Sequence, residues 1–399
     1  MIQTLAILQD AYRELNAKKL FWITLLLSGL VVVAIGIVGI NDRGLTVLGM
    51  TLEAIPLKTS MISEAAFYKL TFMNVGVKLW LSWAAAILAL ISTAGIFPDF
   101  LAGGSIELTL SKPISRIRLF LTKYVSGLLF VALQVGVFTI ASFLVIGIRG
   151  GAWEWRIFLA IPIVVAFFSY LFCLCVLIGL VTRSAVASLL LTILFWLAIF
   201  GLNTTDGILL SVKHAMQRSV DAQMARVEGY DASIEALAAE VPEEAQASVT
   251  TDEEEGDGTG LLGALASAIR TPPPAPGSAE EHALKMAELK TERNRLYDSA
   301  KKSEESLRSI QWWHARVINA KTILPKTQET VALLNESLMR VEEMEQLREM
   351  MTAQGGDSSQ FEAEEELRNR PVWWVLGTSL GFEAVILGIG AWIFCRRDF

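Results

Sequence analysis

Charged side chains that could bind another protein gather in one polar stretch, residues 98–123, which separates two long apolar runs. Its charged residues are the acids Asp99 and Glu107 and the cations Lys112, Arg116, Arg118 and Lys123. The acids can pair with cations of a partner, and the cations with its acids or with lipid headgroups. Pro113 restricts the residue before it and so sets the direction of the chain. We expect residues 98–118 to form a cytoplasmic coupling loop; the alternative is a positively charged inner loop without a partner.

One carboxylate lies inside an apolar run. Glu383 is near the middle of WWVLGTSLGFEAVILGIGAW, which is long enough to cross a bilayer. A carboxylate at that depth is costly and usually faces a transport pathway or a polar partner. Glu383 therefore either lines an intramembrane pathway or is a neutral carboxyl that is hydrogen-bonded to a neighbouring helix. Gly377 and Gly381 in the same run form a G-x-x-x-G pattern, which allows another helix to pack closely.

Motifs for catalysis by the chain itself are absent from the sequence. There is no G-x-x-x-x-G-K-[ST] loop to hold phosphates and no H-E-x-x-H. The 3 cysteines and 3 histidines lack ligand spacing, which argues against a metal site. The acids at 252–257 lack the spacing of an EF-hand, so we expect a solvated linker there, with a loose cation site as the alternative. We expect a protein that is no enzyme, binds no cofactor and takes energy for transport from another chain.

The composition is that of a membrane protein with a polar part attached. Of its 399 residues, 53% are hydrophobic and 19% are charged, whereas soluble proteins are about 25% charged. Residues 204–371 hold 31 of the 41 acids and 18 of the 34 lysines and arginines, so their net charge is −13 and that of the remainder is +6. A basic membrane part suits an anionic inner leaflet, and nothing in this distribution resembles a nucleic-acid-binding surface.

Six apolar runs predict six transmembrane helices, because about 20 apolar residues cross the hydrocarbon core of a bilayer. The predicted spans are residues 20–40, 74–97, 117–148, 157–181, 185–202 and 371–395. Lysine and arginine gather in the short segments that this order places on one side, as is typical of cytoplasmic loops. We therefore predict a multi-pass protein of the plasma or inner membrane with both termini in the cytoplasm. The opposite orientation would put nearly all loop cations outside.

Two segments flank the first span. Residues 1–19 carry apolar side chains at helical spacing, namely Ile2, Leu5, Leu8, Tyr12 and Leu15. Such a helix lies on the membrane surface in contact with lipid; the alternative is a plain cytosolic lead-in. On the other side of the span, residues 41–73 are expected to be an outer loop.

A large insertion, residues 206–370, separates the fifth and sixth spans, and the predicted topology places it outside the cytoplasm. Two stretches follow a heptad a/d pattern. The seam residues are Leu209, Met216, Val220, Val227, Tyr230, Ile234, Leu237 and Val241, interrupted by Lys213 and Gln223, and then Met286, Leu289, Leu296, Ala300, Leu307 and Ile310. We expect an antiparallel coiled-coil hairpin of two helices. Its tip, residues 242–279, is acidic and proline-rich and is predicted to be disordered.

Two further features of the insertion follow the hairpin. Pro325 should end the returning helix, and a third helix is expected over residues 327–354. Trp312 and Trp313 lie either at the outer membrane interface, where tryptophan is enriched, or in the core where the helices meet.

The polar stretch and the spans around it resemble the permease subunits of ABC-2 type transporters. The resemblance lies in F-P-D-F-x-x-G-S-I-E-L-x-L-S-K-P-I-S-R-x-R-x-F-L-x-K between spans two and three, and it covers residues 1–205 and 371–399. It implies a dimer with a second copy or a paralogue, and cytosolic ABC ATPase subunits that bind ATP and Mg²⁺ and receive this stretch in a groove. The insertion at 206–320 is longer than the usual outer connection of the family.

These observations predict an all-α membrane protein with six spans, a surface helix and a helical outer insertion. The leading hypothesis is the permease subunit of an ATP-driven exporter, whose substrate the sequence does not identify. The alternative is a non-transporting membrane subunit that transmits ATPase-driven motion to the hairpin, which would act on an envelope partner through residues 206–320. A membrane scaffold without any ATPase is a third hypothesis.

Overall fold

The computed structural model of the chain describes residues 19–48, 50–52, 62–102, 115–240, 279–339, 345, 365–367 and 370–396. Apart from Lys19 and Ala279, the predicted surface helix at 1–19 and the predicted tip at 242–279 lie outside these residues, and so do Glu107, Lys112 and Pro113. The chain divides into two compact units, Met1–Ile208 with Ala315–Phe399 and Leu209–His314.

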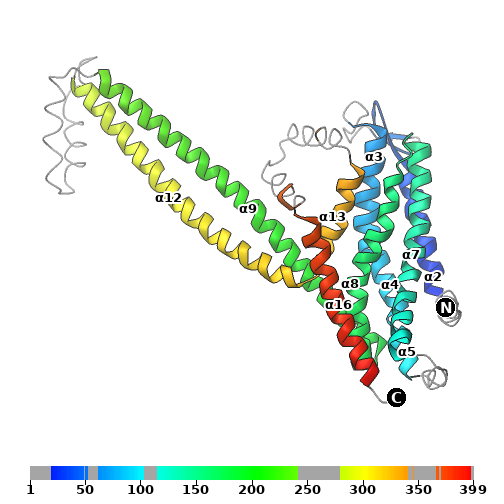
Figure 1. The fold of residues 1–399 in the computed structure, drawn as a ribbon. Helices are drawn as coiled ribbons and strands as arrows, with labels where there is room; N and C mark the ends of the chain where they lie inside the picture. The colour runs from blue at the N-terminus through cyan, green and yellow to red at the C-terminus, as the bar shows by residue number, and fades with distance from the viewer. Residues whose placement is uncertain are drawn as a thin grey trace. The chain divides into compact units, whose positions relative to one another are not determined.

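Among the residues that the structure describes, six helical segments are long and apolar enough to cross a membrane; Figure 1 shows how they are arranged. They are α2 (Lys19–Ile37); a second segment made of α3 (Glu64–Thr71), η1 (Phe72–Ala85), α4 (Ala86–Thr93) and α5 (Ile96–Ala102); α7 (Arg116–Arg149); η2 (Trp155–Leu159) with α8 (Ala160–Thr182); α9 (Ala185–Glu240); and α16 (Val372–Arg396). The prediction of an all-α membrane protein with six such helices is confirmed. The second segment is unusual, because η1 is π-helical and therefore wider than its α-helical neighbours.

Helix α8 is the centre of the bundle and packs against α7, α16 and a short helix, α13 (Thr327–Leu338). The approach of α7 requires a glycine, because a Cβ atom on Gly127 would lie 2.7 Å from the ring of Phe172. The same phenylalanine stacks on Tyr124 of α7, with 5.2 Å between ring centroids. Close packing of this kind holds helices together in lipid, where burial from water contributes little.

The prediction of a loop over residues 41–73 is wrong, because much of this segment is regular structure. A three-stranded antiparallel sheet is formed by β1 (Val38–Asn41), β2 (Gly44–Val47) and β3 (Met50–Leu52). The side-chain oxygen of Asn41 accepts hydrogen bonds from the backbone N–H groups of Arg43 and Gly44, each at 2.9 Å, and so closes the first turn. Ser63 caps α3, which starts the second apolar segment at Glu64 rather than at Asn74.

Helix α9 extends beyond the predicted fifth span, residues 185–202. The helix continues without a break from Ala185 to Glu240, so the fifth span and the first helix of the insertion are one element. The stretch Asn203 to Gly207 consists of weak helix formers. Burial of Asn203 and Asp206 among other elements overrides that local preference.

The second unit consists of the outer part of α9 and most of α12 (Ala279–Ile323), which lie side by side and antiparallel (Figure 1). Four of its buried residues, Val220, Val227, Ala300 and Leu307, fall at predicted seam positions, whereas the buried residues Leu210 and His314 lie outside the predicted seam. An ion pair between Arg293 and Asp231, with 2.9 Å between the charged atoms, also joins the two helices. Trp312 and Trp313 are 48% and 55% exposed, so they do not form part of a helix–helix core.

The third helix of the insertion is described only in part. Helix α13 starts at Thr327, directly after Pro325, as expected, and ends at Leu338. Most residues between 340 and 354 lie outside the described part of the chain.

Candidate functional site

We call residues 98–123 the coupling stretch. Its described residues, 98–102 and 115–123, lie almost entirely in the helices α5 and α7. Asp99 is exposed on α5, and Arg118 is exposed in the first turn of α7. Ser115 caps α7 and its hydroxyl accepts a hydrogen bond from the N–H of Arg118 at 3.4 Å. Both ends of the stretch are therefore held by regular structure, and the charged side chains of Asp99 and Arg118 lie at its surface.

Arg116 connects this stretch to the last turn of α16. Its guanidinium donates a hydrogen bond to the carbonyl oxygen of Cys395 at 3.1 Å. The rings of Phe97, Phe120 and Phe394 meet beside it, with centroid separations of 5.2 to 6.5 Å. Because these rings come from α5, α7 and α16, the ends of the three helices form one packed group next to the coupling stretch.

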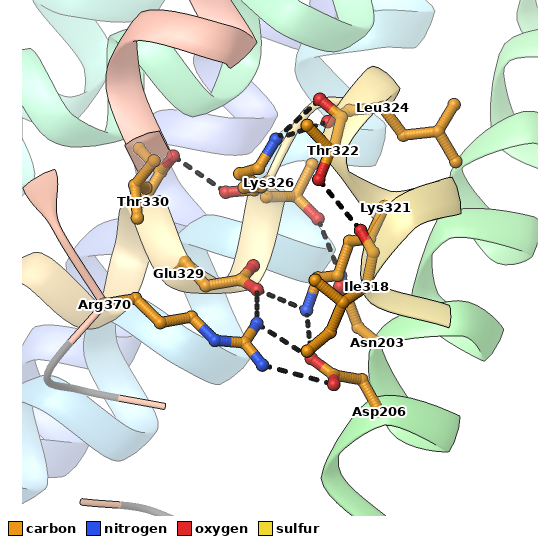
Figure 2. Close-up of polar contacts among 12 residues, drawn as sticks. Asn203, Asp206, Ile318, Lys321, Thr322, Leu324, Lys326, Glu329, Thr330 and Arg370 are labelled. Carbon is orange, nitrogen blue, oxygen red and sulfur yellow. Dashed lines mark hydrogen bonds and ion pairs between the residues drawn. The ribbon is translucent and has the colours of Figure 1, made fainter. Parts of the chain in front are cut away.

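A second polar site lies where the hairpin helices leave the bundle (Figure 2). Figure 2 shows four charged side chains that point toward one another from four segments of the first unit: Asp206 of α9, Lys321 of α12, Glu329 of α13 and Arg370, which precedes α16. We call these four residues the base cluster. All are buried or nearly so, and Asp206 has no exposed surface.

Each acid of the base cluster contacts both cations. Asp206 accepts from the ammonium of Lys321 at 2.8 Å and from the two terminal nitrogens of Arg370 at 2.8 and 3.2 Å. Glu329 pairs with Lys321 and, at 3.1 Å, with Arg370. The four residues thus form a closed ring of ion pairs, in which the planar guanidinium of Arg370 binds Asp206 in a bidentate manner.

Lys326 supplies a third cation beside the base cluster. Its ammonium donates to the carbonyl oxygens of Thr322 and Leu324 at 3.1 and 3.2 Å and to the hydroxyl of Thr378, and it lies 4.4 Å from the ring centroid of Trp374. Burial removes water from the ammonium and lowers the pKa of Lys326 to about 8. Its backbone N–H donates to the hydroxyl of Ser379 at 2.9 Å, so this residue ties the start of α13 to α16.

Comparison with known protein families identifies the chain. Residues 5–399 match the model of the ABC-2 family transporter proteins. The chain belongs to this family. No curated protein and no solved structure matches it. Membership confirms the resemblance drawn from the coupling stretch, and it implies that this ABC-2 protein is a membrane-spanning transporter component associated with an ABC ATPase subunit.

Within the ABC-2 bundle, Glu383 is buried at the contact of α16 with α7 and α8. The hydroxyl of Tyr124 donates to one of its carboxyl oxygens at 2.7 Å and the hydroxyl of Ser169 donates to the other at 2.8 Å. The predicted hydrogen bonding to neighbouring helices is therefore present. A role in a transport pathway stays a prediction.

The two glycines of α16 lie on the opposite side of the helix. A Cβ atom added to Gly377 or Gly381 would meet no atom of the described chain within 4 Å. Leu380 and Val385 beside them are 50% and 63% exposed. Within the described residues this face therefore contacts no other helix of the ABC-2 protein, and the close packing predicted for it requires lipid or another chain.

The base cluster was missed by sequence reasoning, although a signal was present. Asp206 lies 14 residues before Val220 and Lys321 lies 14 residues after Leu307, so each continues the heptad seam of its helix by two heptads. Opposite charges at seam positions of two paired helices predict a buried ion pair. Glu329 and Arg370 carry no such signal, because nothing in the sequence places them beside α9.

Metal ligands do not gather in the parts of the chain that the structure describes, where no group of three His, Cys, Asp or Glu side chains could hold an ion. Cys173 and Cys175 are buried and Cys395 is partly buried, all three as free thiols.

Proposed function

We propose that the chain is the permease subunit of an ATP-driven exporter and that residues 98–123 bind a separate cytosolic ABC ATPase. The contact of Arg116 with the end of α16 carries this proposal, because it connects the coupling stretch directly to a membrane helix. ATP and Mg²⁺ would bind to the ATPase, since the sequence has no phosphate-binding loop of its own.

The proposed arrangement in the membrane follows from the cations. Lysine and arginine in the coupling stretch and at the ends of the chain support an arrangement with both termini in the cytoplasm of a plasma or inner membrane. The open face at Gly377 and Gly381 supports contact with a second permease copy or a paralogue. The hairpin then lies on the outer side of the membrane, where it could contact an envelope protein.

Charge reversal in the coupling stretch tests ATPase binding. The chain is tagged and co-purified with the ATPase of its own cells, and the variants Glu107→Lys, Arg116→Glu and Arg118→Glu are compared with it. We expect the ATPase to be lost, because like charges then face each other across the contact. The control is Lys301→Glu, at an exposed position on α12. Retention of the ATPase in all three variants would overturn the proposal.

Glu383 is proposed to line the pathway that the substrate crosses. Glu383→Gln keeps an oxygen that can accept from Tyr124 and leaves the size of the side chain unchanged. We expect it to reduce the ability of the gene to restore export in a deletion strain, while co-purification of the ATPase is unchanged. Full restoration would remove Glu383 from the pathway and leave it a structural role.

A second candidate function is transmission of motion to the hairpin. The observation that favours it is the continuity of α9, which is one helix from Ala185 in the membrane to Glu240 in the insertion. Deleting residues 213–233 and 294–314 removes three heptads from each hairpin helix and preserves their pairing. Export that survives this shortening supports a simple exporter. Loss of function with the ATPase still bound supports transmission.

A further inference from the structure

Helix α16 is held at both ends by contacts that differ in kind. At the cytoplasmic end the carbonyl oxygen of Cys395 accepts from Arg116 at 3.1 Å. At the other end Arg370, two residues before the helix, belongs to the base cluster, and Ser379 accepts from the backbone of Lys326. The helix of 25 residues is about 37 Å long at 1.5 Å per residue. It therefore connects the coupling stretch with the base of the hairpin in a single rigid element.

The base cluster joins all four segments at one point, whereas the neighbouring hydrogen bonds of Lys326 with Ser379 and of Asn203 with Thr327 each join only two. Its four side chains come from α9, α12, α13 and the residue pair before α16, and the ring of ion pairs closes on itself (Figure 2). The bidentate contact between Arg370 and Asp206 limits rotation as well as separation. Because these groups are buried, water cannot replace one of them at low cost.

A layer of apolar side chains in place of the base cluster would not fix the helices in one register. Two apolar surfaces can slide along each other with little change in contact, whereas buried polar partners specify one register, as a single polar seam residue does in coiled coils. Asp206 and Lys321 occupy the heptad seam of α9 and α12, and both helices continue unbroken from the cluster into the hairpin. The cluster therefore fixes the bases of both hairpin helices to each other and to the outer end of α16.

We infer that the base cluster is a rigid joint through which a displacement of α16, started at the coupling stretch, moves the bases of both hairpin helices together. This inference rests on the second function proposed above, transmission of motion, and it assigns the transmitting residues. In the middle of α16, Glu383 accepts hydrogen bonds from the hydroxyls of Tyr124 and Ser169. These bonds attach α16 to α7 and α8 but are not part of the joint.

Distance measurements on the chain alone test the joint. In a background in which the three free cysteines are replaced by alanine, spin labels are attached at Asn319→Cys on α12 and Val385→Cys on α16, both exposed positions. The protein is reconstituted in lipid nanodiscs with excess unlabelled chain, so that only distances within one copy are recorded. We expect one narrow distance distribution in the parent protein.

Variants of the base cluster should widen that distribution. Asp206→Asn and Glu329→Gln each leave two buried cations with a single acid between them, and we expect the width to increase about twofold or more. Arg370→Lys keeps the charge but loses the bidentate contact, so a smaller increase is expected. If Asp206→Asn fails to fold, Arg370→Lys still tests the base cluster.

Two controls separate the joint from other contacts. Arg293→Gln removes an ion pair inside the hairpin, and Arg116→Met removes the contact at the other end of α16; both should leave the width unchanged. A narrow distribution in every cluster variant, or a broad one in the parent protein, would overturn the joint. Failure of the proposed function is seen separately, as loss of ATPase co-purification or as full function of the shortened hairpin.

Discussion

Buried acids are held in two different ways in this protein, by hydroxyl groups in the middle of the bundle and by cations in the base cluster. Glu383 accepts hydrogen bonds from Tyr124 and Ser169, which are neutral. Asp206 and Glu329 each contact the same two cations, Lys321 and Arg370. The two sites lie along the same helix, since Glu383 is part of α16 and Arg370 immediately precedes it.

The difference shows how depth in the bundle limits polar chemistry. A neutral donor does not require a full counter-charge, so the middle of α16 can keep its shape when the acid is exchanged for an amide. A closed ring of two buried acids and two buried cations cannot lose one acid without leaving an excess of buried positive charge. We therefore expect α16 to tolerate change at its middle and to be sensitive at its outer end.

The largest effect is expected in the base cluster. Asp206→Ala leaves Lys321 and Arg370 with one acid between them, and such uncompensated burial destabilises a protein by about 3–5 kcal/mol. The measurement is the thermal midpoint of the purified protein in detergent, together with its yield from the membrane. The control is Glu304→Ala, which removes an exposed ion pair with Arg308 and should cost about 0.5 kcal/mol or less. Equal thermal midpoints for the two variants would contradict the greater importance of the buried ion pairs over the exposed one.

An intermediate effect is expected at Glu383. Glu383→Leu removes both acceptors and leaves the hydroxyls of Tyr124 and Ser169 without the carboxyl, at a cost of about 1–3 kcal/mol. Glu383→Gln keeps one acceptor oxygen and should lower the thermal midpoint by less than half as much. If the amide is as damaging as leucine, then the acid is held by its charge, and the contrast with the base cluster disappears.

The contrast also explains what the sequence could predict. Length and apolarity suffice for the six membrane helices, and the heptad pattern suffices for the buried residues of the hairpin, because both signals are local. The base cluster depends on side chains as far apart in sequence as Asp206 and Arg370, 164 positions. The packing of α13 against α8 and α16 brings Glu329 to the site, and no local pattern encodes that packing.

Local signals were misleading in two places for physical reasons. The apolar run ends at Leu202 and weak helix formers follow it, but the helix continues because tertiary contacts of Asp206 outweigh propensity. The strands at Val38 to Leu52 are three to four residues long, too short for a clear alternation of polar and apolar residues. The coupling stretch was recognised by its motif, but its contact with Cys395 required the fold.

A smaller effect is expected from pH at Lys326. The pKa of this lysine is about 8 in the folded protein, below its ordinary value of 10.5. Between these values the unfolded chain binds more protons than the folded one, so stability should rise with pH across this window and fall as pH drops through 8. The thermal midpoint at pH 7 and at pH 9.5 is compared for the parent protein and Lys326→Met. The difference between the two pH values should shrink in the variant; an unchanged difference would show that other groups cause it.

The smallest effect on the fold is expected at the open face of α16. Gly381→Ala adds a Cβ atom that meets nothing in the described chain within 4 Å, and alanine is favoured over glycine in a helix by about 1 kcal/mol. The monomer should therefore be as stable as the parent protein or slightly more so. Gly127→Ala is the matched control, since its Cβ atom would lie 2.7 Å from Phe172 and should destabilise the bundle. If a second copy packs on this face, Gly381→Ala should also weaken dimerisation in detergent, as measured by light scattering. A dimer of unchanged strength would place the contact between copies on another helix, and a destabilised monomer would show that this face is covered within the chain.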